Sequence, residues 1–361
     1  ELLPAIETVQ RLGYTDFDAD FLDSLIEGWA THCEEVWLPI NLVGDRKGLK
    51  FEDGKITMPQ EFKDAYRQGI DEGWLSTTCE PEHGGMGVPL FFQAVTWAEF
   101  GTSACMALSV LPALSIGVYE VLVKHGRQDL IDYFATNLAS GEWSGTMCLT
   151  EPHAGTDLGI IETKAIPQDD GTYRLSGSKC FITYGEHDMA ENIVHLVLAK
   201  ASGGPEGTRG ISLFLVPKFL SEDWQSGGLE GISHSLASEH NGVTCSGTEE
   251  KMGLHASPTC VMNLDDSVGW LVGPLHGGMP LMFEMMNRER LATGLMGVGL
   301  AHAAYVNSLA WARERRQGRS LKGVQDPHAA ADNILVHPDV RRMLLEAKVN
   351  NEGCRALAAW I

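Results

Sequence analysis

The ten residues Cys148–Asp157, "CLTEPHAGTD", combine a strand-like start with a proline, a glycine and two threonine hydroxyls. Residues of these types favour turns in which backbone N–H groups and hydroxyls stay available to partners. The segment is therefore either an ordinary loop after a strand or a backbone cradle for an anionic or heteroaromatic ligand. Other segments of the sequence are needed to decide between the loop and the ligand cradle.

Three other segments have residue types suited to a binding site. The glycines of "GGMG" (84–87) do not follow a strand pattern, and "GLMGVG" (294–299) lies in a helical pattern, so neither fits a dinucleotide-binding fingerprint. We expect turns and close helix packing there. "CEPEH" (79–83) offers metal-ligating side chains, but no second cluster completes a coordination set, and we expect a solvated loop and no metal.

The composition limits the classes of partner. A net charge of −21 would repel a nucleic-acid backbone, so we expect no nucleic acid partner, and an anionic ligand would need a local basic pocket. The eight cysteines include no CxxC pair, which favours reduced thiols in a cytoplasmic protein. No apolar run approaches the roughly 18 residues that cross a bilayer, so we expect no membrane partner.

Hydrophobic periodicity predicts an α+β protein of three parts. Residues 1–143 read as an all-α domain, in which Asp18 or Asp20 is suited to cap a helix containing Leu22 and Trp29. Residues 144–265 are rich in short strands, with "DDG" and "SGS" as candidate hairpin turns, and predict a central β domain resembling a barrel or sandwich. Residues 266–361 predict the start of a C-terminal helical bundle, apparently truncated because Ile361 ends a helical pattern without a cap.

Several segments in a fixed order carry a resemblance to a known family. They are "PEHGGMG" (81–87), "CLTEPHAGTD", "SGSKCFITYGEHDMA", "EEKMGLHASPT", "NRERLATG" and "ARERRQG". Together they resemble the acyl-CoA dehydrogenase family, and the longer N-terminal part is similar to the subgroup that includes 3-methylmercaptopropionyl-CoA dehydrogenases. The resemblance runs from about residue 18 to the end of the chain.

The resemblance implies a flavoprotein oxidoreductase of fatty acid metabolism. Such an enzyme uses FAD to convert an acyl-CoA thioester into the 2-enoyl-CoA, passes the electrons to an electron-transfer flavoprotein, and forms a homodimer or a dimer of dimers. Two alternatives remain open: an acyl-CoA oxidase that uses oxygen, and a non-catalytic scaffold that keeps the fold without flavin.

The family pattern also implies roles for individual residues. Thr150, with Met147 and Leu149 beside it, would contact the pyrimidine side of the flavin. Phe181, where the family often has tryptophan, would stack on the ring, and Thr183 would hydrogen-bond near N5, the hydride acceptor. A β domain with incidental hydroxyls is the alternative interpretation.

Other matches concern the two anionic ligands. Arg315 matches the arginine that reaches the FAD pyrophosphate of the neighbouring subunit, although Gln-Gly-Arg stands where the family has an aromatic residue and glycine. Thr156 and Arg290 match positions that contact coenzyme A. Each has a structural alternative: an arginine favoured at a helix end, a turn cap, or a surface ion-pair partner.

The catalytic base must remove the α-proton of the thioester, which requires a carboxylate with a raised pKa. The commoner family position lies in an aromatic-Glu-Gly segment, which this chain does not contain. The rarer position is occupied by Glu289. We expect the base beyond Ile361, with Glu289 as the candidate inside the chain and an exposed helical residue as its alternative.

Overall fold

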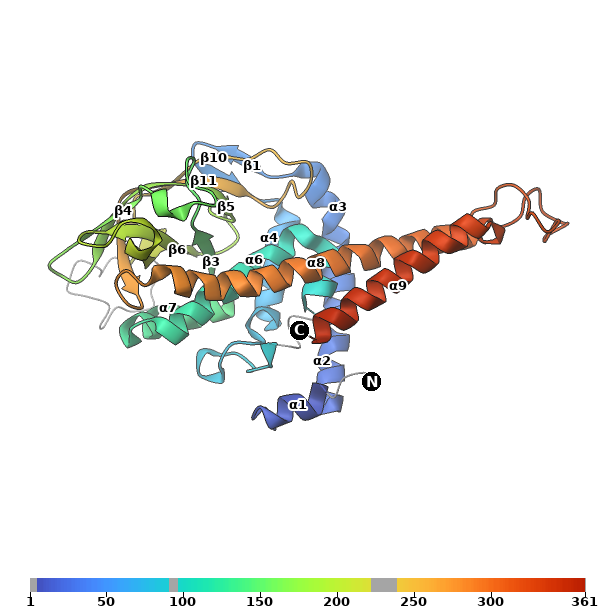
Figure 1. Ribbon diagram of the computed structural model, residues 1–361, viewed down its shortest axis with the longest axis horizontal. Coiled ribbons are helices and arrows are strands. Elements are labelled where there is room, and N and C mark those ends of the chain that lie inside the picture. The colour runs from blue at the N-terminus through green and yellow to red at the C-terminus, as the bar shows by residue number, and fades with distance from the viewer. Residues whose placement is uncertain (1–4, 91–96, 222–238, 361) are drawn as a thin grey trace. The chain divides into compact units, whose positions relative to one another are not determined.

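The computed structural model describes residues 5–90, 97–221 and 239–360 (Figure 1). The chain divides into two compact units. One comprises Glu1–Thr31, Pro89–Ala104 and Leu291–Ile361 (unit 1), and the other comprises His32–Val88 and Cys105–Arg290 (unit 2).

Unit 2 is built around a seven-stranded sheet with the strand order β10-β11-β5-β4-β6-β3. Strand β7 pairs with both β6 and β11, so β11, β5, β4, β6 and β7 close into a ring. The β3–β6 and β4–β6 pairs are parallel and the others antiparallel. The strands are β3 (Trp143–Cys148), β4 (Lys164–Pro167), β5 (Tyr173–Thr183), β6 (Asn192–Ala201), β7 (Ile211–Pro217), β10 (Val243–Thr248) and β11 (Thr259–Val272).

Further elements of unit 2 precede or flank this sheet. Two short antiparallel strand pairs, β1–β2 and β8–β9, form separate two-stranded sheets. Their bounds and those of the helices are α3 (Leu38–Lys47), β1 (Lys50–Glu52), β2 (Lys55–Thr57), α4 (Gln60–Asp71), α7 (Gln128–Ser140), β8 (Phe219–Leu220) and β9 (Glu239–His240), with a π-helical turn at Cys33–Trp37.

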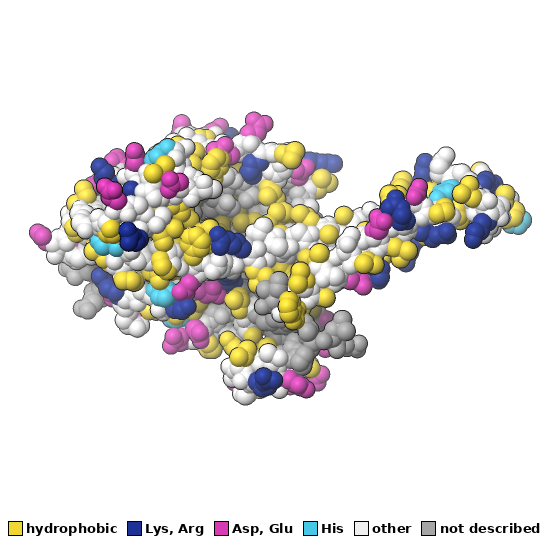
Figure 2. Space-filling model, in the orientation of Figure 1, with side chains coloured by type: hydrophobic (Ala, Val, Ile, Leu, Met, Phe, Trp, Pro, Cys, Tyr) yellow, Lys and Arg dark blue, Asp and Glu magenta, His cyan; other side chains and the backbone are white. Residues whose placement is uncertain are grey.

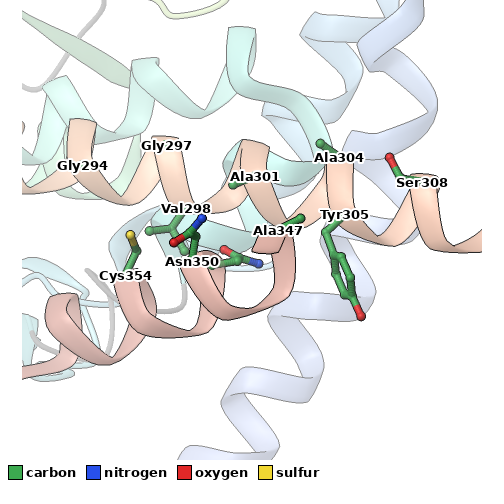
Figure 3. Close-up of a pocket in the computed structure, with 11 residues that line it drawn as sticks. Gly294, Gly297, Val298, Ala301, Ala304, Tyr305, Ser308, Ala347, Asn350 and Cys354 are labelled. Carbon is green, nitrogen blue, oxygen red and sulfur yellow. The ribbon is translucent and has the colours of Figure 1, made fainter. Parts of the chain in front are cut away.

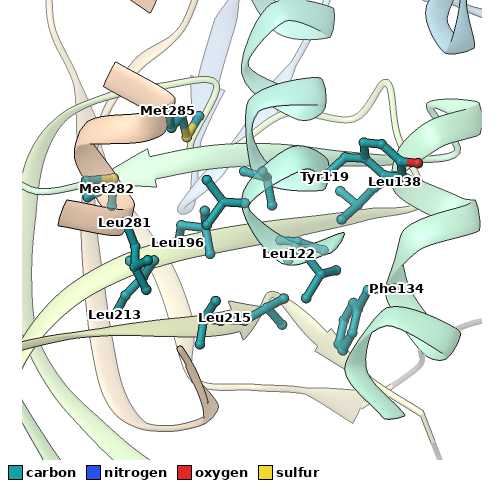
Figure 4. Close-up of a cluster of buried hydrophobic side chains, with 14 of the residues drawn as sticks. Tyr119, Leu122, Phe134, Leu138, Leu196, Leu213, Leu215, Leu281, Met282 and Met285 are labelled. Carbon is teal, nitrogen blue, oxygen red and sulfur yellow. The ribbon is translucent and has the colours of Figure 1, made fainter. Parts of the chain in front are cut away.

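The core of unit 2 lies between the sheet and helices. Figure 4 shows side chains of α6 (Ala98–His125), α7 and the start of α8 (Gly278–Glu314) converging with those of β6 and β7. Strand β7 is buried along its whole length, which explains its uninterrupted apolar sequence "ISLFLVP".

Helix α6 has an unusually apolar sequence. By length and composition it could cross a bilayer, but 67% of its most apolar window is buried inside the fold, and a core helix meets the same criteria. Leu108, Leu111, Val118 and Leu122 are fully buried. Its packing role accounts for its composition.

Unit 1 is helical in the part of the chain that the structure describes. It contains α1 (Ala5–Arg11), most of α2 (Ala19–His32), the start of α6, the second half of α8, and α9 (Pro338–Trp360). Arg355 Nε on α9 donates to Glu99 Oε2 on α6 at 2.9 Å, and Ser103 Oγ donates to the Gly299 carbonyl on α8 at 2.9 Å. These bonds tie three helices that are far apart in the sequence.

The predicted order of helical, β and helical parts is confirmed, and Asp18 is the helix cap, because its Oδ1 accepts from the backbone N–H of Phe21 at 2.8 Å. Three details are wrong. The N-terminal part contains the β1–β2 hairpin, "SGS" lies inside β5, and β11 continues to Val272, past the predicted boundary at residue 265. Asp265 and Asp266 look like a turn, but they form an irregularity within β11, where Asp266 adopts φ 51°.

Candidate functional site

A β-bulge near the end of β5 turns Phe181 out of the sheet. The pairing with β11 shifts between Cys260 and Met262, opposite Phe181, and Phe181 adopts φ 60°. A positive φ is unusual for a bulky residue and costs about 1–3 kcal/mol, so the surrounding structure must hold it. Its ring is 60% exposed, between the buried Cys180 and Ile182. An outward-facing aromatic ring held by a strained backbone suits the stacking of a flat heteroaromatic ligand.

Two half-buried hydroxyl residues belong to the segments that adjoin this bulge, Thr150 after β3 and Thr183 at the end of β5. Thr150 follows β3, and its carbonyl accepts from the Cys180 N–H at 2.9 Å, which brings the two segments together. Thr183 ends β5 opposite Thr259, and the next residue, Tyr184, donates its backbone N–H to the Pro258 carbonyl at 2.8 Å. An exposed ring with threonine hydroxyls on adjoining segments fits a flavin, which needs both stacking and edge hydrogen bonds.

Met147 and Leu149 have a different environment from the one their predicted role suggests. Leu149 is buried in the core of unit 2, and Met147 is partly buried and packs against it. Their side chains therefore help to anchor β3 and the segment after it. A contact of either residue with flavin stays a prediction.

A buried ion pair underlies the same two segments. Lys179 on β5 is fully buried, and its Nζ donates to Glu151 Oε1 at 2.8 Å and to the Leu149 carbonyl at 3.0 Å. Burial lowers the pKa of Lys179 and, by itself, raises that of Glu151, but hydrogen bonds from the Glu162 N–H and from Lys179 hold the Glu151 pKa below its ordinary value. This pair is not among the predicted site residues, although a lysine on the inward-facing side of an apolar strand pattern is a signal for it.

Thr156 lies exposed in the loop after β3. The next residue, Asp157, caps a short 3₁₀ turn at Leu158–Ile160 by accepting from the Gly159 N–H at 3.1 Å. Capping therefore belongs to Asp157, which leaves the Thr156 hydroxyl available to a ligand. Its contact with coenzyme A remains a prediction.

Glu289 lies on the first half of α8, one helical turn after the buried Met285. The residue is half-buried, and its Oε1 is shielded from solvent. Burial raises the pKa of Glu289, while the charge of Arg288 opposes the rise and that of Glu120 adds to it. Arg288 forms an ion pair with Glu120 of α6. Glu289 is therefore half-buried with a raised pKa and not a fully exposed helical residue, while its role as the base stays a prediction.

Arg290 differs from Glu289 in being exposed. Its guanidinium lies 5.0 Å from the centroid of the Phe283 ring and donates to Asn287 Oδ1 at 2.9 Å. These neighbours on the same helix hold its side chain without neutralising its charge. The charge stays available to an anion, and a contact with coenzyme A stays a prediction.

Basic side chains gather on the loop that joins α8 and α9 in unit 1 (Figure 2). Arg316 pairs with Asp326, and Arg319 pairs with the buried Asp332, so both hold the loop together. Among the described residues, Arg315 makes no such pair; it is exposed, and its guanidinium lies 5.9 Å from the Trp311 ring centroid. Of these three arginines, Arg315 is therefore the one without a carboxylate partner among the described residues, and its contact with the FAD pyrophosphate stays a prediction.

Asp332 organises this loop. Its carboxylate accepts from the backbone N–H groups of Ser320, Asp326 and Gln325 at 2.9, 2.8 and 3.0 Å, and from Arg319 Nη1 at 3.3 Å. The backbone N–H groups, that of Ser320 foremost, lower the pKa of Asp332 to about 2. The loop is thus tied to one carboxylate that stays charged at neutral pH.

A groove of about 500 Å³ runs between α8 and α9 (Figure 3). Small residues, among them Gly294, Gly297 and Ala301, line one side, and Asn350 and Cys354 lie opposite. None of the candidate site residues lines it. The sequence predicts close helix packing at these small residues, but along part of α8 they border an open groove.

Three family descriptions match consecutive parts of the chain. Residues 50–142 match the acyl-CoA dehydrogenase N-terminal domain, residues 146–267 the middle domain, and residues 276–360 the C-terminal domain. The middle match contains Thr150, Phe181 and Thr183, and the C-terminal match contains Glu289, Arg290 and Arg315.

Individual relatives agree with these matches. The chain is 43% identical to a 3-methylmercaptopropionyl-CoA dehydrogenase of Ruegeria pomeroyi over 98% of its own length and 58% of the relative's. It is 38% identical to a butyryl-CoA dehydrogenase of Syntrophomonas wolfei over 95% of its length and 56% of that protein's. A solved acyl-CoA dehydrogenase of Bacillus anthracis complexed with FAD has the same fold, with a TM-score of 0.74, 22% identity, and coverage of 96% of this chain and 50% of that one.

The chain thus spans somewhat more than half the length of the curated relatives it matches. The three domain matches occur in the order of the helical, β and helical parts of the fold. The predicted resemblance is confirmed: the chain belongs to the acyl-CoA dehydrogenase family.

Proposed function

We propose that this chain forms the FAD-binding and acyl-CoA-binding parts of a dehydrogenase that converts an acyl-CoA thioester into the 2-enoyl-CoA. The observation that carries the proposal is the outward-facing Phe181, strained at its bulge and flanked by the hydroxyls of Thr150 and Thr183. The fit of this surface to an isoalloxazine ring is supported by the family, which is FAD-dependent. When bound there, FAD would supply the hydride acceptor.

The residues of the chain would have separate tasks around that cofactor. Phe181 would hold the ring plane, while Thr150 and Thr183 would fix its edges by hydrogen bonds. Arg290 and Thr156 would bind the anionic and polar parts of coenzyme A, and Arg315 would bind the FAD pyrophosphate of a second copy. An assembly in which one copy completes the cofactor site of another is a homodimer or a dimer of dimers.

The proposed electron acceptor is an electron-transfer flavoprotein, as the family resemblance implies. The free cysteines, of which seven are buried, are consistent with a reducing, cytoplasmic setting. The oxidase alternative differs from the dehydrogenase only in the acceptor, so one experiment can test the reaction and the acceptor together.

We expect the purified yellow protein to lose flavin absorbance when saturated anaerobically with a short- or medium-chain acyl-CoA. Absorbance should then return faster with electron-transfer flavoprotein than with air-saturated buffer, as followed by stopped-flow spectroscopy. Rapid reoxidation by oxygen with stoichiometric peroxide would identify an oxidase instead. Protein that carries no flavin after incubation with FAD would support the scaffold.

Glu289 provides the test of the base. In the full-length protein we expect Glu289→Gln to leave the rate of flavin reduction within about tenfold of the parent, well short of the two to four orders of magnitude of a lost base. The reason is that the commoner base position of the family lies in a segment that these 361 residues do not contain. Stopped-flow reduction with saturating acyl-CoA measures this directly.

The opposite outcome is also interpretable, because a raised pKa is a property of catalytic carboxyl bases and Glu289 has one. A thousandfold fall in flavin reduction with unchanged acyl-CoA binding would make Glu289 the base. Glu284→Gln is the matched control, because Glu284 lies on the same helix with its pKa lowered, first by a hydrogen bond from Lys124.

A further inference from the structure

The residues proposed to contact flavin come from strands that do not pair with each other. Thr150 follows β3, whereas Phe181 and Thr183 belong to β5, and β4 and β6 lie between these strands in the sheet. The ladder of the sheet therefore does not set the spacing between the two segments. The backbone bond from Cys180 to the Thr150 carbonyl joins them at one point.

Lys179 supplies two more links, one on each side of Thr150. Its Nζ bonds the Leu149 carbonyl at 3.0 Å and the Glu151 carboxylate at 2.8 Å, so the residues before and after Thr150 are held by one ammonium group. Lys179 is itself two positions before Phe181 on β5. One buried charge thus connects the segment of Thr150 with the bulge that presents Phe181.

Both oxygens of the Glu151 carboxylate accept further hydrogen bonds. Oε2 accepts from the Glu162 N–H at 2.6 Å, and Oε1 accepts from the Thr163 N–H at 3.1 Å and the Thr163 hydroxyl at 2.5 Å. Gly177 on β5 permits this approach, because a Cβ there would come within 2.4 Å of the Thr163 hydroxyl. Hydrogen bonds from Glu162 and Thr163, and the bond from Lys179 to the Leu149 carbonyl, therefore hold the pair in place.

A buried ion pair is by itself weak evidence for a role in stability. Burying two charges costs desolvation, and replacing both with apolar groups is often neutral or stabilising. A buried pair at this place is better accounted for by the geometry that it imposes. The strained backbone of Phe181 is of the kind that persists only where neighbouring structure over-determines it.

We infer that the buried Glu151–Lys179 pair positions the flavin-contacting residues, by fixing the segment of Thr150 against the bulge of Phe181. This inference rests on the proposed FAD site. Both are positioning residues, which act through their neighbours, and their effect belongs to cofactor retention more than to folding.

The test separates these two effects with single and double variants of the full-length holoenzyme. We expect Lys179→Met and Glu151→Gln each to lower the melting temperature, because each leaves a buried partner without its counterpart. We also expect each to raise the rate of FAD release, followed by flavin fluorescence after dilution, by about 10-fold or more, the range for a lost charged hydrogen bond. In the double variant the melting temperature should recover part of the loss, because neither charge is left unpaired, while the fast release of FAD should persist.

The Lys218–Glu186 pair is the matched control. Glu186 is buried and Lys218 partly buried, with a contact of 2.6 Å, but this pair joins the segments after β7 and β5. Lys218→Met should lower the melting temperature and leave the rate of FAD release within about twofold of the parent. If FAD retention instead recovers with stability in the double variant, or Lys218→Met releases FAD equally fast, the pair at Lys179 is only structural and the inference is wrong. A parent protein that holds no FAD would overturn the proposed function as well, and is seen before any variant is made.

Discussion

Replacing Thr183 with alanine is expected to slow the reduction of bound flavin by acyl-CoA about 100-fold, the usual effect of removing one preorganised donor beside developing charge. Retention of FAD should weaken by less than about tenfold, because one neutral hydrogen bond is lost among many contacts. Thr183 is half-buried at the end of β5, and the Tyr184–Pro258 backbone bond fixes its position. The backbone that carries the hydroxyl is thus held in place before any ligand binds. Stopped-flow reduction and FAD release measure the two effects separately.

Thr183→Ser is the control for this variant, since it keeps the hydroxyl and removes only a methyl group. We expect serine to restore most of the rate of reduction. A reductive half-reaction of Thr183→Ala as fast as that of the parent would show that this hydroxyl does not serve the hydride acceptor.

Arg315→Ala is expected to raise the dissociation constant of FAD about 10- to 100-fold, as the loss of a charge-assisted bond to phosphate implies. The loss should follow subunit association, because the arginine is proposed to serve the pyrophosphate of a second copy. FAD titrations at several protein concentrations, with sedimentation of the same samples, would show both together.

Arg313→Ala removes the same charge two residues earlier, on the last turn of α8. We expect it to retain FAD within about threefold of the parent, because long-range charge alone is largely screened at physiological salt. An Arg315→Ala protein that stays dimeric and holds FAD as tightly as the parent would reduce Arg315 to a surface charge.

The alternation of helical and β parts is visible in the sequence because it depends on local periodicity. Asp18 is recognisable as a cap for the same reason. The boundary after residue 265 is not, since two aspartates that suggest a turn lie inside β11, where a long-range pairing with β5 overrides their local preference.

The candidate site likewise has features that the sequence predicts and features that it does not. The family resemblance points to Thr150, Phe181 and Thr183, but the bulge and the positive φ that turn Phe181 outward arise from pairing with β11 and have no local signature. The full burial of Lys179 likewise depends on where β3 and the Thr163 segment lie. Burial of Glu289 depends on contacts of α8 with other helices, so sequence alone could not distinguish it from its exposed neighbour Arg290.

The loop around Asp332 has a consequence for how this protein can diverge. Three of the donors to its carboxylate are main-chain N–H groups, which every residue type except proline provides. The exposed side chains of the loop, such as Leu321 and Val324, can therefore be exchanged without altering its path. Related sequences that diverge from this one can therefore carry different exposed side chains on this loop, while the path of its backbone and the position of Arg315 stay the same.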